Sequence, residues 1–278
     1  WGFFTRCQWG EFDTALYELE RCWGEKPGSP SPIGAAGRVT PARLITSLSD
    51  VHEAMSWYLN QIPDEVVSVA THLSTDISYR EVSDEEMREA LVRRHVAGHS
   101  ERDIYANYIN ELFLDGLSRL SRPPLFQFSI GAEPLPYETG SRLSQSTLGE
   151  LAALISRHPR IRFQCFNACN HANQSLCTLC RELPNLSLAG YWWHNFYPSY
   201  IERIMKERID MLPVNRQVGF FSDAYCVEWV FAKSMVIRRL LARALAEKIS
   251  LGQLSKESAL EFARVSLSNT AKRFYGLE

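Results

Sequence analysis

The sequence predicts an α/β fold in which short buried strands alternate with helices. Five apolar segments rich in β-branched and aromatic residues have the length of strands. Segments with helical periodicity separate them, which is typical of parallel strands joined by crossover helices. Of the 278 residues, 45% are hydrophobic and 12% aromatic, so the chain can bury a substantial core.

The expected elements follow one another along the chain. Strands are expected at residues 65–74, 124–132, 160–168, 185–193 and 217–225. Helices are expected at residues 83–120, 145–158, 172–182 and 198–211, with two more at about 226–249 and 255–274. An amphipathic helical stretch at 11–23 comes before a loop rich in Gly, Pro and Ser at 26–37.

The net charge limits which partners the protein can attract, and the cysteine content indicates its redox compartment. The net charge of −2 and the pI near 6.4 provide no bulk attraction to nucleic acid or to an anionic membrane. No apolar run approaches the ~20 residues of a membrane span, and we see no signal peptide. Seven cysteines, an odd number, favour reduced thiols. We therefore expect a cytoplasmic protein that binds neither nucleic acid nor membrane.

The segment "CFNACNHANQSLCTLC" (165–180) has the composition of a zinc site. However, Cys165 falls in an expected strand, whereas Cys177 and Cys180 fall on the next helix, three residues apart. Structural zinc sites require two paired ligand sets on tight knuckles, and cysteines divided between a strand and a helix do not provide them. We favour ordinary buried thiols over a zinc site that would also use Cys169 or His171.

Polar residues follow the expected strands at their carboxyl ends, where parallel α/β proteins place their chemistry. They are Thr71, His72, Ser129, Asn167, Asn170, His194, Asn195, Ser222 and Asp223. Each could instead cap the following helix. Asp223 is the strongest candidate, because it follows the apolar run "QVGFF" and a carboxylate there could hold a metal or take a proton.

Six segments, in chain order, resemble the uronate (glucuronate) isomerases of the amidohydrolase superfamily. "FQFSIGA" resembles that family's Gln-x-His-Ile-Gly-Ala strand, and "VGFFSDAY" resembles Val-Gly-Met-Leu-Thr-Asp-Ser-Arg. The other segments lie at 39–72, which ends like the family's Ser-Asp-His, at 163–170 (Tyr-Cys-Leu-Asn-Pro), at 190–195 (Gly-Trp-Trp-Phe-Asn-Asp) and at 267–277 (Asn-Asn-Ala-x-x-Tyr-Phe).

The resemblance implies a distorted, amidohydrolase-type (β/α)8 TIM-barrel-like fold, of which this chain shows the C-terminal five strands. We accordingly divide the chain into an N-terminal segment and loop, 1–38, and the C-terminal portion of a barrel, 39–278, with a helical insertion at about 83–120. The first three strands of the family's barrel are expected to be absent from this sequence.

The resemblance also implies site residues. Asp223 and His72 are carried over as catalytic, with Asp223 as a metal ligand, and Trp192, Ser129 and Tyr225 as substrate-binding. A complete family member would hold a divalent metal, zinc by preference. That cofactor is in doubt here, because no His-x-His pair occurs in the sequence. Thr71 replaces an Asp, Ser129 a His and Tyr225 an Arg of the family pattern.

The function implied is aldose–ketose isomerisation of a hexuronate, of the D-glucuronate to D-fructuronate type. Two other classes stay open: a non-catalytic paralogue that binds sugar acids, and a metal-dependent hydrolase on the same barrel. In each case the expected partner is a small sugar acid, and a homo-oligomer is allowed for. Without the His-x-His pair, these 278 residues alone are expected to bind metal weakly and not to turn over glucuronate.

Overall fold

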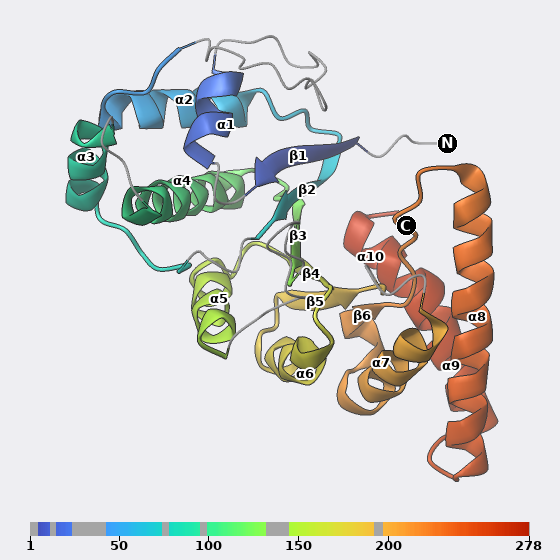
Figure 1. The fold of residues 1–278 in the computed structure, drawn as a ribbon. Coiled ribbons are helices and arrows are strands. Elements are labelled where there is room, and N and C mark those ends of the chain that lie inside the picture. Colours follow the sequence, from blue (N-terminus) through green and yellow to red (C-terminus); the bar gives the residue numbers. More distant parts are fainter. Residues whose placement is uncertain are drawn as a thin grey trace. The chain divides into compact units, whose positions relative to one another are not determined.

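In the computed structural model the described residues are 5–11, 15–23, 43–73, 78–94, 99–131, 145–191 and 197–277. They divide into two compact units, Trp1–Pro124 and Leu125–Glu278. Figure 1 draws the helices and strands of both units. No helix formed by these residues is both long and apolar enough to cross a membrane.

The first unit combines a pair of parallel strands with helices. Strand β1 (Thr5–Glu11) lies parallel to β2 (Val66–His72), and Glu11 is the register partner of His72. The helices are α1 (Ala15–Cys22), α2 (Leu48–Asn60), α3 (Asp84–Val92) and α4 (His99–Arg119). Strand β1 is not among the strands expected from the sequence, because "TRCQWGE" mixes polar and apolar residues and lacks a β-branched run.

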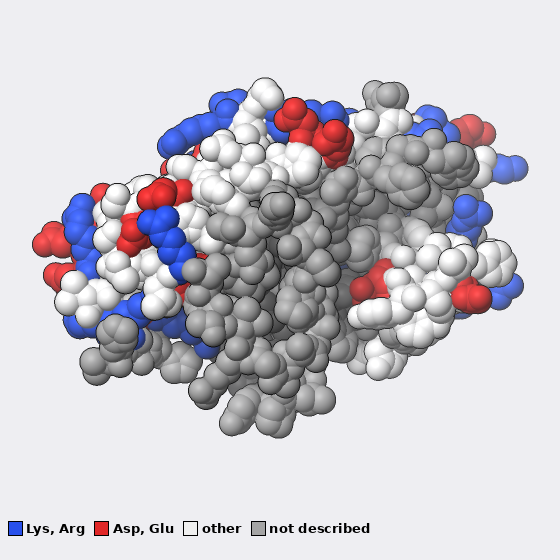
Figure 2. All heavy atoms as spheres, turned by 90° about the horizontal axis from the view of Figure 1, so that it is seen from above, with Lys and Arg blue, Asp and Glu red and all other residues white. Residues whose placement is uncertain are grey.

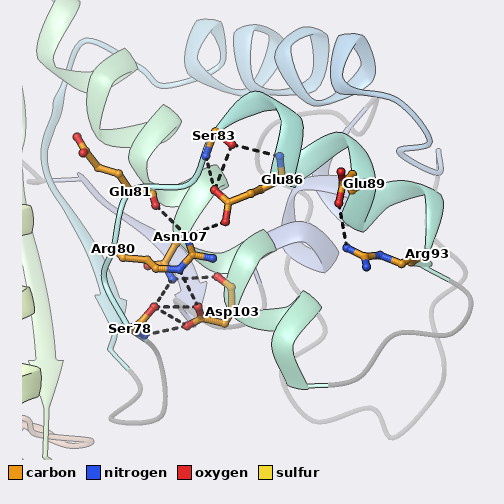
Figure 3. Close-up of polar contacts among 9 residues, drawn as sticks. All are labelled: Ser78, Arg80, Glu81, Ser83, Glu86, Glu89, Arg93, Asp103 and Asn107. Atoms are coloured by element: carbon orange, nitrogen blue, oxygen red, sulfur yellow. Dashed lines mark hydrogen bonds and ion pairs between the residues drawn. The ribbon is translucent and has the colours of Figure 1, made fainter.

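Local sequence sets where α2 and α3 begin. Ser47 and Asp50 form a capping box at the start of α2, and Ser83 and Glu86 form a second one at α3 (Figure 3). A buried carboxylate then joins distant segments of the unit. Glu20 accepts two hydrogen bonds from the Arg94 guanidinium, at 2.5 and 2.6 Å, and one from the Ile45 backbone at 2.7 Å.

The described residues of the second unit form four parallel strands in the order β3, β4, β5, β6. They are β3 (Leu125–Ile130), β4 (Phe163–Asn167), β5 (Leu186–Ala189) and β6 (Gln217–Val218). The helices are α5 (Gln145–Arg157), α6 (Asn173–Glu182), α7 (Pro198–Met211), α8 (Val227–Ser250), α9 (Lys256–Arg264) and α10 (Thr270–Tyr275), with a π-helical segment, Val265–Asn269, between α9 and α10. The expected alternation of parallel strands and helices is confirmed.

The two faces of these strands bury different side chains. One face, formed by alternate residues such as Phe128, Phe163 and Cys165, is apolar, and Phe128 and Phe163 pack edge to face. The other, which we call the inner face, carries Gln127, Ser129, Gln164 and Phe166. On the inner face, Tyr275 of α10 donates to Gln164 and accepts from Gln127. Helix α10 therefore covers part of the inner face with a polar contact.

The helices of the second unit form a further core. Tyr191 and apolar side chains of α7, α8 and α9 pack together, and Figure 1 shows α8 as a long helix alongside α7 and α9. The buried members are Tyr191, Ile201, Ile204, Met205, Ile237, Leu240, Leu241, Ala244, Leu245 and Ala259. This cluster anchors α8 and thereby fixes the segment that enters α8 from β6.

Strand β6 is shorter than the sequence suggests. The apolar run 217–225 was expected to be a strand throughout, but pairing with β5 ends at Val218. The backbone N–H of Gly219 donates instead to the Ser266 carbonyl at 2.8 Å. A Cβ on Gly219 would lie 3.2–3.3 Å from Ser266 atoms. The π-helical segment therefore approaches this backbone closely and takes over its hydrogen bond.

Candidate functional site

Residues in the left-handed backbone region follow several strands at their carboxyl ends. Tyr79 (φ 40°) lies beyond β2, Gly131 (φ 87°) directly follows β3, Gly190 (φ 37°) follows β5, and Asp223 (φ 45°) lies beyond β6. This conformation is ordinary for Gly but disfavoured for residues with a Cβ. Within the described part of the chain, Tyr79 and Asp223 are therefore the non-glycine positions where the surrounding structure must offset a backbone cost.

The glycines permit close approach between neighbouring connections. A Cβ on Gly131 would lie 2.8 Å from the Cβ of Cys169, and a Cβ on Gly190 would lie 2.5 Å from the Cβ of Phe221. Phe221 also packs on Phe166, with the ring centroids 4.3 Å apart. The connection that carries Asp223 is thus packed tightly against the ends of β4 and β5.

Ser129 lies at the carboxyl end of the inner face. It precedes the last residue of β3, is the register partner of Phe166, and is 8% exposed. Phe166 in turn contacts Phe221, which is two residues before Asp223. Ser129 and Asp223, both predicted from the sequence, therefore belong to one edge of the second unit and are linked through two aromatic rings.

Asp223 itself is exposed. It does not cap α8: the N-cap residue of that helix is Cys226, which makes no side-chain capping bond. The alternative role raised from the sequence, a helix cap, is therefore excluded. The Asp223 side chain is open to solvent, as contact with a dissolved ligand requires.

Lys233 is a residue of this edge that sequence reasoning missed. It lies within α8 and is only 6% exposed. Its Nζ donates to the backbone carbonyls of Ser222, at 2.7 Å, and Asp223, at 3.1 Å. A lysine on an amphipathic helix normally extends into water, so the sequence contained no signal for this contact.

Aromatic and aliphatic side chains next to Asp223 are open to solvent. Tyr225 is 87% exposed, and its ring meets that of Trp229 edge-on at 5.9 Å. Val227, Val230 and Phe231 are also exposed. The Tyr225 hydroxyl can donate a hydrogen bond to a ligand, but it carries no charge for pairing with a carboxylate.

His72 and Thr71 end strand β2 in the first unit, with His72 exposed and Thr71 buried. Ser78, where the described chain resumes beyond this strand, is bonded to α4, as Figure 3 shows. The Ser78 backbone N–H donates to Asp103 at 2.8 Å, and the Ser78 hydroxyl lies 2.8 Å from the other Asp103 oxygen. Asn107 donates to the same hydroxyl at 3.2 Å. The predicted proximity of His72 to Asp223 remains a prediction.

Trp192, together with His194 and Asn195, lies outside the described residues. Its predicted role as a pocket aromatic therefore also remains a prediction. In the second unit Ser129 and Asp223 lie at one edge, where Lys233 binds the backbone. Tyr225 is exposed two residues after Asp223, and its role at this edge remains a prediction.

The cysteines divide as expected between strand and helix. Cys165 lies in β4 and Cys177 and Cys180 in α6, and all three are buried. Burial raises the pKa of the Cys165 thiol to about 12 and that of Cys177 to about 11, and it raises the pKa of Cys180 well above its ordinary value. These groups are thiols at neutral pH, whereas a zinc ligand must be a thiolate. The absence of bound zinc stays a prediction.

The donor groups of the described residues bear on whether the protein can hold a metal ion. Among them, no group of three or more His, Cys, Asp and Glu side chains is placed to hold a metal ion. Asp223 alone would be an incomplete ligand shell. The described residues therefore do not fit the divalent metal that the resemblance implies.

No protein-family model and no curated protein matches the sequence. Solved structures do match. The chain is similar to a glucuronate isomerase from Caulobacter crescentus (TM-score 0.74, 15% identity, 95% of this chain and 55% of that one) and to a uronate isomerase from Thermotoga maritima (0.71, 14%, 83% and 54%). It is also similar to a Lactobacillus casei protein named as a candidate metal-dependent hydrolase (0.59, 15%, 82% and 60%).

These similarities show the fold. The chain has the TIM-barrel-like α/β fold of the uronate isomerases, as the resemblance in sequence implied. It spans about half the length of the two isomerases.

Proposed function

We propose that the protein is uronate isomerase-like: it binds a hexuronate at a site built for aldose–ketose interconversion, and turnover is impaired in these 278 residues, which contain no His-x-His pair. The observation that carries the proposal is the fold: similarity to a glucuronate isomerase extends over 95% of this chain. The edge that carries Ser129 and Asp223 supports it, since ligands of parallel α/β folds bind at the carboxyl ends of the strands.

Isomerisation moves a proton between adjacent carbons, so it needs a base and donors to the enediolate oxygens. In our proposal the exposed Asp223 carboxylate takes the proton. The hydroxyls of Ser129 and Tyr225 donate hydrogen bonds to sugar oxygens. His72 is a second candidate for the base, at the end of β2, and Trp192 is the proposed aromatic neighbour of the sugar.

A non-catalytic sugar-acid-binding protein is the second candidate. Two observations favour it: the described residues assemble no metal site, and Tyr225 occupies the position at which the family pattern has an arginine. A hydroxyl there can bind a sugar oxygen, but it does not replace a guanidinium.

We also propose that the partner is a small sugar acid and that the protein is soluble and acts without nucleic acid. On the face drawn in Figure 2, blue Lys and Arg side chains of the described residues are interspersed with red Asp and Glu side chains. Such a mixture supports the expectation drawn from the net charge of −2.

The test measures binding of the aldose substrate and of the ketose product of the reaction. An isomerase site must accept D-glucuronate and D-fructuronate, whereas a binding protein needs to accept only one of them. We expect calorimetry to show binding of both acids and not of neutral D-glucose. Asp223→Asn should weaken both interactions and leave stability nearly unchanged, since an exposed carboxylate is replaced by an amide of equal size.

Binding of a single acid would favour the non-catalytic candidate, and binding of neither would contradict the proposal. Turnover is measured in the same preparation, with the Caulobacter crescentus enzyme as the positive control. We expect none from these 278 residues, because they contain no His-x-His pair.

A further inference from the structure

We propose that Lys233 is a positioning residue: its ammonium holds the connection from β6 to α8 in the backbone conformation that presents the Asp223 carboxylate. The effect on ligand binding rests on the proposed function, but the effect on the backbone does not.

The two carbonyls that Lys233 binds belong to the two peptide units on either side of the Asp223 Cα. The Ser222 carbonyl, 2.7 Å from Nζ, lies in the preceding peptide, and the Asp223 carbonyl, 3.1 Å from Nζ, lies in the following one. Bonding both peptide planes to one donor restricts φ and ψ at the residue between them, since these two torsions set how the planes are oriented. A single side chain thus bonds to both peptide units that set the backbone conformation of Asp223.

The connection needs such a clamp because its own sequence does not favour the conformation. Asp223 has φ 45°, a region that residues with a Cβ avoid. The N-cap residue of α8, Cys226, makes no side-chain bond that would fix the helix entry. Lys233 acts from within α8, which is anchored by Ile237, Leu240 and Leu241 in the helical core.

The environment of Lys233 keeps its ammonium in place. The residue is 6% exposed, and Nζ lies 5.1 Å from the centroid of the Trp229 ring, within the range of a cation–π contact. A buried ammonium is costly unless it is bonded, so the two carbonyls and the ring favour one position. The direction in which the Asp223 side chain leaves the backbone follows from that position.

The experiment compares Lys233→Met with Lys248→Met in the full chain. Lys248 is a matched control, since it is also a buried lysine of α8 (8% exposed), but its Nζ binds the Asp210 carboxylate at 2.5 and 2.7 Å. We expect both variants to lower the melting temperature. Only Lys233→Met should change the three-bond HN–Hα coupling and Cα chemical shift of residue 223, which report its φ.

With D-glucuronate as the probe, we expect Lys233→Met to weaken binding by about ten- to a hundredfold and Lys248→Met to leave it unchanged. Lys233→Arg keeps a cationic donor and should retain most of the affinity. Combining Lys233→Met with Asp223→Asn should weaken binding no further than Lys233→Met alone, because Lys233 acts through Asp223.

A glycine substitution provides the rescue. Gly adopts positive φ without steric cost, so Asp223→Gly in the Lys233→Met background should recover part of the lost melting temperature without recovering ligand binding. An unchanged φ at residue 223 in Lys233→Met would overturn the proposal. If Lys233→Met does not fold, the same couplings measured in Lys233→Gln decide the question. If wild-type protein binds no hexuronate, the proposed function fails, and the couplings still decide the role of Lys233.

Discussion

Tyr79 and Asp223 share an unusual backbone conformation, but the structure holds them in different ways. Tyr79, beyond β2, has φ 40° and is 1% exposed, and the neighbouring Ser78 is bonded to Asp103. Asp223, beyond β6, has φ 45° and an exposed side chain, and the carbonyls that flank its Cα are bonded to Lys233. Burial offsets the backbone cost at the first position, and backbone hydrogen bonding offsets it at the second.

This difference distinguishes a residue that supports the fold, Tyr79, from one that we propose for function, Asp223. At Tyr79 the strained residue is itself part of the core, so its side chain contributes to folding. At Asp223 the strained residue contributes no packing, and its carboxylate faces solvent at a strand end. A backbone cost without a packing gain is the pattern typical of functional positions.

The largest effect is expected from removing the Tyr79 side chain. Tyr79→Ala should destabilise the first unit by about 3–5 kcal/mol, because a large buried side chain leaves a cavity. Hydrogen exchange of α4 amides measures the change. Tyr17→Ala is the control, since Tyr17 is 45% exposed and surface changes are usually small. Equal effects of the two substitutions would show that Tyr79 is not held by burial.

A smaller loss is expected from Asp103→Ala, which removes the acceptor of the Ser78 backbone N–H and hydroxyl. Leaving these groups without their partner should cost about 1–3 kcal/mol, measured by the same exchange experiment. The control is Glu53→Ala, which breaks an exposed ion pair with Arg43 and should cost little. A loss of stability no larger than that of Glu53→Ala would show that Asp103 does not hold the backbone next to Tyr79.

The buried thiols of the second unit predict a pH dependence. The pKa of Cys165 is raised from 9.0 to about 12 by burial, so above pH 9 the unfolded chain loses a proton that the folded chain keeps. The stability that Cys165 contributes is therefore fully present below pH 9 and is lost as the pH rises towards 12, with a loss of about 1–2 kcal/mol at pH 10. Cys165→Ala should flatten the decline seen in denaturant titrations at pH 8 and 10. Cys226→Ala, at an exposed cysteine, should not, and identical slopes in all three proteins would contradict the prediction.

The smallest expected effect tests most directly how Asp223 differs from Tyr79. Asp223→Gly should stabilise the second unit by about 0.5–1 kcal/mol, since glycine removes the cost of a Cβ at positive φ and no packing is lost. Tyr79→Gly should destabilise the first unit instead, because burial is lost. Thermal melts of both variants measure the contrast. Destabilisation by Asp223→Gly would show that the Asp223 side chain supports the fold.

Much of the fold could be predicted from the sequence because burial leaves a local pattern. "VVSVATH" and "FQCFN" are apolar runs of strand length, and the helices between them keep their periodicity. Strand β1 escaped prediction because "TRCQWGE" has no such run and depends on pairing with β2. The shortness of β6 escaped it because the contact that ends the strand comes from Ser266, far along the chain.

The sequence by itself determined the alternation of strands and helices, the division of cysteines between β4 and α6, and the candidate residues Ser129 and Asp223. These follow from hydrophobic periodicity and residue chemistry, which act over a few neighbouring positions. Only the tertiary structure decided that Asp223 does not cap α8, that its φ is positive, and that Lys233 holds it. The contact with Lys233 joins two backbone carbonyls to a side chain ten and eleven residues further along the chain, and the length and direction of α8 bring them together.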